Sequence, residues 1–453
     1  MRLDPVFRHL KKALFFALVP LLNGQENWPT FRGTGARGIS DDTTLPMRWS
    51  ETKNVAWKQD LPGRGWSSPI VWGNLVFITT VVSSGEMEFP KKGLYFGGER
   101  PTPSGDMHAW ITMAMDTDTG QTVWKKTLIQ AAPTSSTHVK NTYASETPVC
   151  DGKHLYVYLG YKGLYCLDMQ GNLVWKKNWK SRKTRYGWGT SSSPILHHDK
   201  VIIVNDNMED SWMGAFDKAT GKEIWKIQRD EPSNFSTPFI WENSRRTEII
   251  TTGVHKTRAY DLEGKALWTC KGMSSICIPT PFAEKDRLFV AGGYVGDKER
   301  PNKPVYVIRP GASDDITLPP GQFSSAFIQW MQPDSAPYNP SPLLYKNRFY
   351  VLWDFGFLSS RNATTGAEVY EKQRFQPRGR TAFTSSPWAY RDHLFCLSED
   401  GDTYVVRASD TFTLSHVNAL NEMCMASPAM ANGSLYIRTL TALYCIREPL
   451  GQL

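Results

Sequence analysis

One carboxylate stands out beside eight recurring prolines of this chain. Glu146 lies two residues before Pro148, and no other Asp or Glu occupies either of the two positions before any of these prolines. A carboxylate in a cleft can accept hydrogen bonds from a ligand, and its pKa responds to burial. The alternative is a loop residue that hydrogen-bonds only within the protein. Glu146 is therefore our first candidate for a ligand contact, and we predict no catalytic residue.

A hydroxyl group precedes every one of the same prolines. Such hydroxyls can satisfy backbone groups where strands begin, which is the interpretation that we favour. The functional alternative is a polar ring around a channel mouth, and under it we name Ser193, Thr237 and Ser386 as candidate ligand contacts. The eight residues are Ser68, Thr147, Ser193, Thr237, Thr280, Ser341, Ser386 and Ser427.

Aromatic residues recur in the segments that lead into these positions. Flat rings can stack on a planar ligand or a sugar, although packing between structural units is their commoner role. The candidates for ligand contact are Trp66, Tyr143, Trp188 and Phe235, and Tyr338 and Phe383 occupy similar places.

The prolines mark a structural repeat. Each follows a hydroxyl residue and precedes a short apolar segment, a polar turn and a strong strand pattern, as in SSPIVWGNLVFI and SSPILHHDKVIIV. Their spacings are 79, 46, 44, 43, 61, 45 and 41 residues, which is a period of 41 to 46 with two insertions. A period of this length with four short strands per unit is typical of β-propellers. We therefore predict an all-β fold, an eight-bladed β-propeller of four-stranded antiparallel blades.

A second phrase closes most repeats. It runs from Asp through a turn glycine to Trp, as in AMDTDTGQTVWKK and AFDKATGKEIWKI. The glycine supplies the positive φ of a tight hairpin turn, and the Trp then falls inside the last strand of the blade. We expect these indole rings to be buried between neighbouring blades. The four residues are Trp124, Trp175, Trp225 and Trp268.

The two phrases resemble the pyrroloquinoline-quinone (PQQ) type of propeller repeat, whose docking motif is A-x-D-x-x-T-G-x-x-x-W. The likeness covers residues 54–447, and the phrases WPTFRG and KNTYASETPV add to it. The chain thus resembles the PQQ-binding-like β-propeller family, which is related to quinoprotein alcohol dehydrogenase-like propellers and to the BamB-type propeller of outer-membrane assembly. The resemblance implies the fold, whereas activity differs within such families.

The ends of the repeat region are complementary. The eighth repeat stops after its third strand, at residues 443–446, and residues 54–60 resemble a fourth strand with Trp57 at the docking position. Pairing of these N- and C-terminal segments would close the ring and leave no open edge. We therefore divide the chain into a signal peptide (1–24), an N-terminal extension (25–53) and a single propeller domain (54–450).

Three insertions interrupt the compact repeat. Residues 82–109 and 293–304 lie between strands two and three of blades one and five, which face each other across a ring of eight. We expect both loops to cap the same mouth of the central channel, where long loops usually serve binding. The third insertion, 311–326, joins strands three and four of blade five and is expected on the opposite face.

The N-terminus and the composition favour a location outside the cytoplasm. Four basic residues precede an apolar run at residues 13–22, which is typical of a cleavable secretory signal and too short for a membrane span. No cysteine follows it before Cys150, so we expect a secreted or periplasmic protein that is not a lipoprotein. The net charge of +8 is spread along the chain, which does not favour a nucleic-acid partner.

The seven cysteines are odd in number and never adjacent. We interpret most of them as small buried apolar residues, and a disulfide between Cys270 and Cys277 is the alternative for that pair.

Two functions are weighed on these observations. We favour a noncatalytic, monomeric binding or scaffolding module that holds a peptide, a glycan or a partner protein on its loop-capped face. The alternative is a PQQ-dependent oxidoreductase with an atypical cofactor site. In the related dehydrogenases Ca²⁺ or a similar cation lies on the carbonyls of PQQ, and the clamp on the cofactor includes two adjacent cysteines; this chain has no such pair. We accordingly predict no metal ligands and assign no cofactor.

Overall fold

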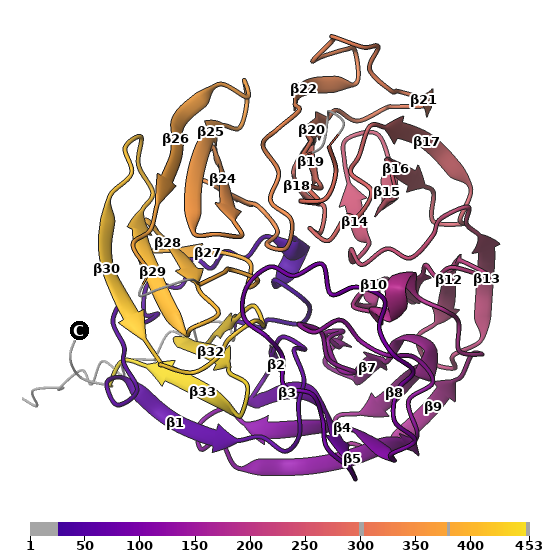
Figure 1. The fold of residues 1–453 in the computed structure, drawn as a ribbon, viewed down its shortest axis with the longest axis vertical. Helices are drawn as coiled ribbons and strands as arrows, with labels where there is room; N and C mark the ends of the chain where they lie inside the picture. Colours follow the sequence, from indigo (N-terminus) through magenta and orange to yellow (C-terminus); the bar gives the residue numbers. More distant parts are fainter. Residues whose placement is uncertain (1–25, 299–302, 378–380, 450–453) are drawn as a thin grey trace, which may run out of the picture.

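Eight antiparallel sheets radiate from a central channel in the computed structural model, which describes residues 26–298, 303–377 and 381–449 (Figure 1). The predicted eight-bladed propeller is confirmed. Helix in these ranges is limited to three short 3₁₀ turns, and no helix there is long and apolar enough to cross a membrane. The turns are η1 (Thr34–Ala36), η2 (Gly160–Lys162) and η3 (Arg185–Gly187). The predicted signal peptide lies outside the described residues.

Each of the first four blades is a continuous run of strands from the channel outward. Blade one holds β2 (Ile70–Trp72), β3 (Leu75–Ser83), β4 (His108–Asp116) and β5 (Thr122–Ala131). Blade two holds β6 (Val149–Cys150), β7 (His154–Tyr158), β8 (Leu164–Asp168) and β9 (Leu173–Lys177). Blade three holds β10 (Ile195–His197), β11 (Lys200–Asn205), β12 (Trp212–Asp217) and β13 (Glu223–Gln228). Blade four holds β14 (Phe239–Glu242), β15 (Thr247–Gly253), β16 (Lys256–Tyr260) and β17 (Ala266–Lys271).

The last four blades follow the same order, except that the outermost strand of blade eight comes from the N-terminal side. Blade five holds β18 (Phe282–Glu284), β19 (Arg287–Ala291), β20 (Val305–Ile308) and β22 (Ile328–Gln332). Blade six holds β23 (Leu343–Tyr345), β24 (Arg348–Trp353), β25 (Phe357–Asn362) and β26 (Glu368–Arg374). Blade seven holds β27 (Trp388–Tyr390), β28 (His393–Leu397), β29 (Asp402–Arg407) and β30 (Leu414–Ala419). Blade eight holds β31 (Ala429–Ala431), β32 (Ser434–Arg438), β33 (Ala442–Arg447) and β1 (Val55–Asp60).

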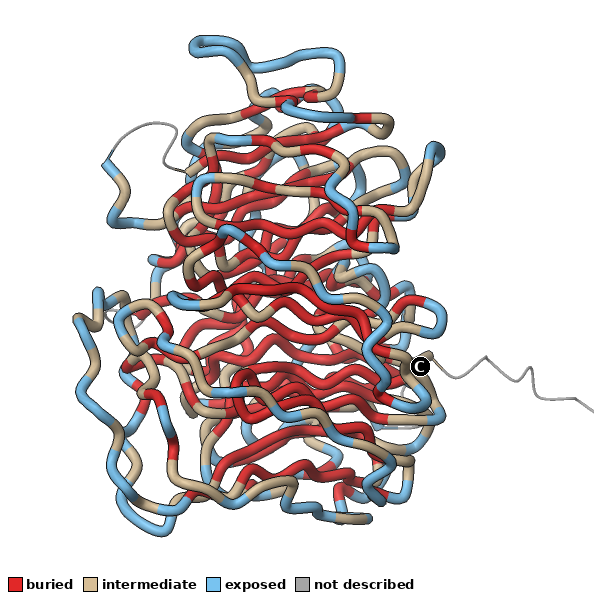
Figure 2. Tube along the Cα trace, turned by 90° about the vertical axis from the view of Figure 1, so that its right-hand side faces the viewer, coloured by how far each residue is buried: buried red, intermediate tan, exposed pale blue. Residues whose placement is uncertain are grey.

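The core lies between the blades. Both faces of a blade pack against neighbours, so its middle strands carry nearly continuous apolar runs in place of a strict alternation. In β11, for example, all residues from Val201 to Val204 are buried. Figure 2 shows buried strands stacked through the molecule, with long exposed loops projecting on the left. The burial of apolar surface therefore holds the ring together from blade to blade.

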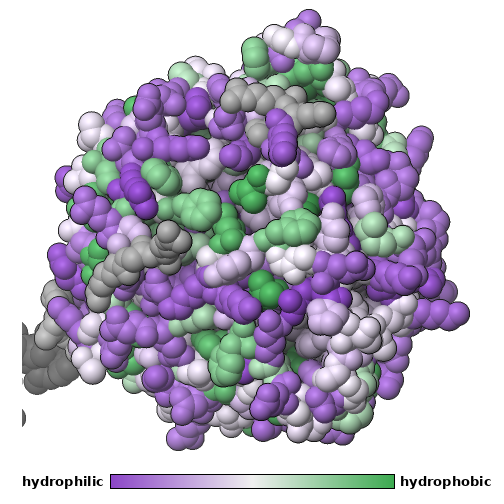
Figure 3. All heavy atoms as spheres, viewed as in Figure 1, coloured by the Kyte–Doolittle hydropathy of each residue, from purple (hydrophilic) through white to green (hydrophobic). Residues whose placement is uncertain are grey.

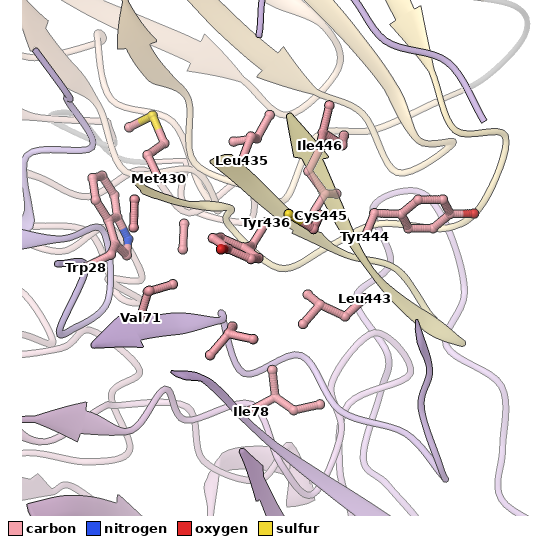
Figure 4. Packing of buried hydrophobic residues seen from close by; sticks show 14 of the residues in the cluster. Trp28, Val71, Ile78, Met430, Leu435, Tyr436, Leu443, Tyr444, Cys445 and Ile446 are labelled. Carbon is pink, nitrogen blue, oxygen red and sulfur yellow. The ribbon is translucent and has the colours of Figure 1, made fainter. Parts of the chain in front are cut away.

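The ring closes as predicted from the two ends of the repeat region. β1 pairs antiparallel with β33, with Lys58 opposite Tyr444. Trp28, from the segment before β1, packs with residues of blades one and eight, including Val71 and Met430 (Figure 4). Segments from both ends of the chain thus share one apolar cluster.

Three of the four docking tryptophans lie against the turn glycine of the following blade. The pairs are Trp124 with Gly171, Trp175 with Gly221 and Trp225 with Gly264. In the last pair the indole Nε1 donates to the carbonyl of Leu262 at 2.8 Å, and Gly264 has a φ of 85°. A side chain on that glycine would meet the indole ring. The glycine therefore meets two needs, a positive φ and a flat surface for the ring.

Of the four rings expected to be buried between blades, one is buried and three are partly exposed. Trp124, Trp175 and Trp225 are half-buried, whereas Trp268 is only 2% exposed. An outermost strand has no further strand beside it, so its side chains keep contact with water. Trp268 differs because the 311–326 insertion adds β21 (Asp314–Asp315) to the outer edge of blade four.

The same observation corrects the position of the third insertion. β21 pairs in parallel with β17, so this insertion runs along the outer rim of a neighbouring blade, and the expected place on the opposite face is wrong. All seven cysteines are buried and free, so the alternative of a Cys270–Cys277 disulfide is not realised either.

The N-terminal extension covers one end of the central channel. Its backbone bonds to residues that follow the repeat prolines: Trp28 pairs with Val71, and the amide of Cys150 donates to the Pro29 carbonyl at 2.9 Å. Across the ring, the buried Arg32 donates to the carbonyl of Pro342 at 2.8 Å. Phe31 lines the channel interior from this side. The extension thus covers this end of the channel, and a cavity of about 440 Å³ lies between it and the inner strands of blades two to five.

Candidate functional site

A cavity of about 180 Å³ lies at the mouth of the channel that the extension leaves open. We call it the mouth pocket. The segments before the eight repeat prolines all contribute to its wall, because they converge where the innermost strands begin. From blades one to eight these residues include Trp66, Ser145, Trp188, Phe235, Ile278, Tyr338, Thr384 and Met425.

The loop between β3 and β4, residues 84–107, crosses this mouth from blade one toward blade seven. The amide of Gly93 donates to Glu399 Oε2 at 2.7 Å, and the amide of Lys91 donates to the Val139 carbonyl at 2.9 Å. These bonds place Leu94 and Tyr95 in the wall of the pocket. The expectation that the first insertion caps the channel is confirmed.

The described part of the second insertion reaches the same mouth. Tyr294 packs on Tyr338 of the pocket wall, with ring centroids 5.2 Å apart. Asp297 accepts a hydrogen bond from the amide of Ser275 at 2.7 Å. Residues 299–302 lie outside the described ranges.

A buried ion pair joins the pocket to the loop that covers it. Lys140 Nζ lies 2.5 Å from Glu399 Oε1, and both side chains are almost inaccessible to water. Lys140 also donates to Thr384 Oγ1 at 2.9 Å, and that hydroxyl donates to Glu399 at 2.6 Å. Removal of either charge would leave the other buried and unpaired, so the three side chains act as one unit.

His138 is held neutral beside this pair. Burial lowers the pKa of its imidazole to about 4. Its Nε2 lies 3.1 Å from the carbonyl of Tyr95, and its Nδ1 accepts a hydrogen bond from the amide of Lys140 at 3.2 Å. The ring also packs on Trp188, with centroids 4.8 Å apart. The histidine therefore positions the covering loop at neutral pH and carries no charge.

Three of the predicted aromatic residues meet in the mouth pocket. Trp66, Trp188 and Phe235 come from blades one, three and four and all line it. Tyr143 does not. Its ring packs on Trp110 and borders a separate cavity of about 200 Å³ under the covering loop, and burial raises its pKa to about 12.

The hydroxyl residues form a belt inside the channel. The backbone amide of Ser193 donates to Thr237 Oγ1 at 3.0 Å, and the amide of Ser386 donates to Ser427 Oγ at 2.9 Å. Six of the eight neighbouring pairs are joined in this way. The interpretation that the hydroxyls satisfy backbone groups where strands begin is therefore confirmed for these six. Each hydroxyl accepts a hydrogen bond from the backbone amide just before the innermost strand of the preceding blade. Ser193, Thr237 and Ser386 also line an inner cavity of about 130 Å³ below the mouth pocket.

Glu146 is directed away from the pocket. Its buried carboxylate accepts a hydrogen bond from Thr190 and lies close to Gly160, beyond the pocket wall. Burial raises the pKa of this carboxyl to about 7. The structure therefore places it behind the wall that its neighbours Ser145 and Thr147 help to form.

Comparison with known proteins agrees with this architecture. The family model described as outer membrane protein assembly factor BamB matches residues 108–271. A protein with that name from Burkholderia pseudomallei is 22% identical in an alignment of length 249 that covers 48% of this chain and 61% of the relative. The match thus spans less than two thirds of that relative's length.

Solved structures extend the likeness to the whole ring. BamB from Moraxella catarrhalis superposes with a TM-score of 0.52 and 12% identity, over 83% of this chain and 99% of that one. A europium-containing methanol dehydrogenase gives 0.58 and 12%, over 92% and 90%. The quinohemoprotein alcohol dehydrogenase of Comamonas testosteroni gives 0.55 and 13%, over 94% and 82%. The chain therefore has the β-propeller fold of these structures, and its likeness to PQQ-type repeats agrees with it. The fold alone does not decide between binding and redox chemistry.

The mouth of this propeller does not suit a quinone site with Ca²⁺. Such a site needs several oxygen donors around the cation, together with a carboxylate base. Within the described residues no three His, Cys, Asp or Glu side chains are grouped closely enough to hold a metal ion. The carboxylate of Glu399 is already bonded to Lys140, and that of Glu146 lies outside the pocket.

Sequence reasoning missed several residues that form the site. Lys140 and Glu399 are 259 positions apart, and neither occupies a repeated motif position that would single it out. Tyr95 lies in an insertion without internal repeats. The phrase KNTYASETPV contains Lys140 and was noticed only for its resemblance, so it offered the one available signal.

Proposed function

We propose that this PQQ-like propeller is a noncatalytic binding module that acts in the periplasm or outside the cell and holds a partner protein on its loop-capped face. The mouth pocket carries the proposal, because all eight blades and the covering loop combine to build one aromatic cavity. Glycan and free peptide are less well supported, since the relatives named above include assembly factors. The signal-like N-terminus supports the location.

The chemistry of the pocket fits an apolar side chain of a partner. Aromatic and aliphatic side chains form about half of its walls, and its one buried cation is neutralised by Glu399. A cavity of about 180 Å³ admits a single large side chain, and such pockets are where interfaces place their strongest contacts.

Exposed aromatic residues extend the surface around the pocket. Phe96, on the covering loop, is 59% exposed and packs edge-on against Tyr186 and Trp188. Figure 3 shows apolar residues gathered near the middle of this face among polar ones. Exposed aromatic surface of this kind is enriched in protein interfaces.

Photo-crosslinking tests the proposed face. Benzoylphenylalanine replaces Phe96 in one variant and Phe323, a residue of similar exposure in the 311–326 insertion, in the other. We expect a discrete protein adduct from position 96 in the producing cells, and its loss when Phe235 is also changed to Ala. An adduct from position 323 alone would show that the wrong surface has been chosen.

Titration with PQQ and Ca²⁺ tests the noncatalytic part of the proposal. We expect neither a bound chromophore nor a rise in Tm in the purified protein. A stoichiometric quinone spectrum that disappears in a Trp66→Ala variant would contradict it.

A further inference from the structure

The outer edge of blade four shows how a peptide can add to this propeller. β21 lies parallel to β17, with Asp314 opposite Trp268 and Asp315 opposite Thr269. The amide of Ile316 donates to the carbonyl of Thr269 at 2.9 Å. Of the strands in the described ranges, β21 alone pairs with the free side of an outermost strand (Figure 1).

Charge and apolar contact hold this added segment. Lys271 Nζ lies 2.9 Å from Asp315 Oδ2, and Ile316 is buried in the same apolar cluster as Trp268. The bound segment is therefore acidic and then aliphatic, whereas the strand that receives it supplies an indole, free backbone groups and a lysine. Backbone bonds give such additions their affinity, and side chains give them specificity.

The outermost strands of blades one and two also combine an aliphatic residue, a Trp and lysines, without a covering segment. Their lysines follow the Trp by one and two positions, whereas Lys271 follows Trp268 by three. We call β5 and β9 the basic edges. Both contain a Trp-Lys-Lys sequence, Trp124-Lys125-Lys126 and Trp175-Lys176-Lys177. The aliphatic residue before each Trp is well exposed, Val123 at 55% and Val174 at 46%. The corresponding Leu267 of blade four packs against the apolar cluster beside the added segment.

The lysines of the basic edges lack acidic partners. In the described part of the chain, none of Lys125, Lys126, Lys176 and Lys177 forms an ion pair, whereas Lys271 in β17 does. Other outermost strands are not basic in this way. β26 carries Glu368 and Glu371, and β1 carries Asp60.

We propose that the basic edges bind an extended segment of a partner protein, with two adjacent acidic residues followed by an aliphatic residue, by parallel strand addition. An unpaired strand edge offers rows of amide and carbonyl groups, and edge lysines normally discourage pairing with similar edges. The same lysines attract a strand that carries acidic side chains. The basic edges therefore select an acidic occupant and disfavour a second basic edge.

This surface is separate from the mouth pocket. The edges lie on the outer rim of the ring (Figure 1), whereas the pocket is lined by the segments that lead into the innermost strands. The inference does not depend on the function proposed above, and either can fail alone.

The chain supplies its own probe, a fluorescent peptide with the sequence of residues 311–326, GASDDITLPPGQFSSA. We expect it to bind the whole protein and to slow hydrogen exchange in β5 and β9. Changing Lys125, Lys126, Lys176 and Lys177 to Glu should weaken binding at least tenfold, as should changing both aspartates of the peptide to Asn. The control is Lys58→Glu with Gln59→Glu, which places two carboxylates after the docking Trp57 of β1 and should leave binding unchanged.

Three results would overturn the proposal. The first is equal binding by the charge-reversed and control variants, with both confirmed as folded by circular dichroism. The second is exchange protection confined to β17 or to the mouth loops. The third is concentration-dependent self-association that disappears when residues 311–326 are deleted, which would assign the basic edges to a second copy of the chain.

Discussion

The carboxyl group of Glu146 connects one side chain to the pH dependence of folding. Its pKa is raised from 4.5 to about 7 by burial, with Thr190 as a hydrogen-bond donor. Because the folded state holds this proton more tightly than the unfolded state, its contribution is largest below pH 4.5. It is then lost as the pH rises to about 7. The group thus favours folding in mildly acidic conditions.

A Glu146→Gln variant tests this effect. The amide keeps an oxygen that can accept from Thr190 and cannot ionise. The difference in unfolding free energy between the variant and the wild type should increase in favour of the variant by about 2–3 kcal/mol from pH 5 to pH 8. Urea denaturation at the two pH values measures this difference. A constant difference between the two proteins would show that the carboxyl does not titrate in this range.

At the same scale, the pocket shows what residue types alone could and could not tell. Trp66, Trp188 and Phe235 were found because aromatic rings recur before the repeat prolines. Glu146 was chosen for its rarity at that position, yet its side chain leaves the channel for Thr190. The direction of one side chain depends on the local backbone of its loop, and the spacing of residues does not contain it.

Among the elements, the outermost strands differ in how well they are covered. Trp225 in β13 is half-buried and contacts the turn of blade four, whereas Trp268 in β17 is buried beneath the added segment. The cost of removing a side chain grows with the packing that it loses. The two docking tryptophans should therefore contribute unequally to the free energy of unfolding.

Substitution of each tryptophan by Ala measures this inequality. We expect Trp225→Ala to cost about 2–3 kcal/mol and Trp268→Ala to cost about 4–5 kcal/mol, since the second also leaves Glu248 without its indole donor at 2.6 Å. Urea denaturation of both variants gives the comparison. Equal losses of unfolding free energy would mean that the segment over β17 does not strengthen the packing of Trp268.

For the whole molecule, the ring depends on a strand that comes from the far end of the chain. β1 covers β33, and the segment before it closes one mouth of the channel. An open β33 would be a long unpaired edge, which promotes association. The two roles of the N-terminal region can therefore be separated by truncation.

Two truncated chains test this separation. A chain that begins at Lys53 keeps β1 and should remain a folded monomer, with a Tm lower by several degrees because Trp28 and Trp49 are removed from the core. A chain that begins at Pro62 lacks β1 and should aggregate. Size-exclusion chromatography and thermal melts followed by circular dichroism distinguish them. Identical behaviour of the two chains would show that β1 is not needed for closure.

The sequence by itself determined the number of blades, their four strands, the closure of the ring and the loop that covers the mouth. These features follow from the proline spacing, from the Asp-Gly-Trp hairpins and from the position of the insertions, because each blade is built from hairpins that are local in the chain. The resemblance of the repeats to one another made the count possible.

Only the tertiary structure decided which distant residues meet. Lys140 and Glu399 are 259 positions apart, Arg32 and Pro342 are 310 apart, and β21 adds to the blade before its own. Such contacts arise when a closed ring brings all eight blades around one axis. Repeat spacing fixes where each strand stands in the ring, whereas loop conformation and side-chain direction fix what lies in the pocket and along the rim.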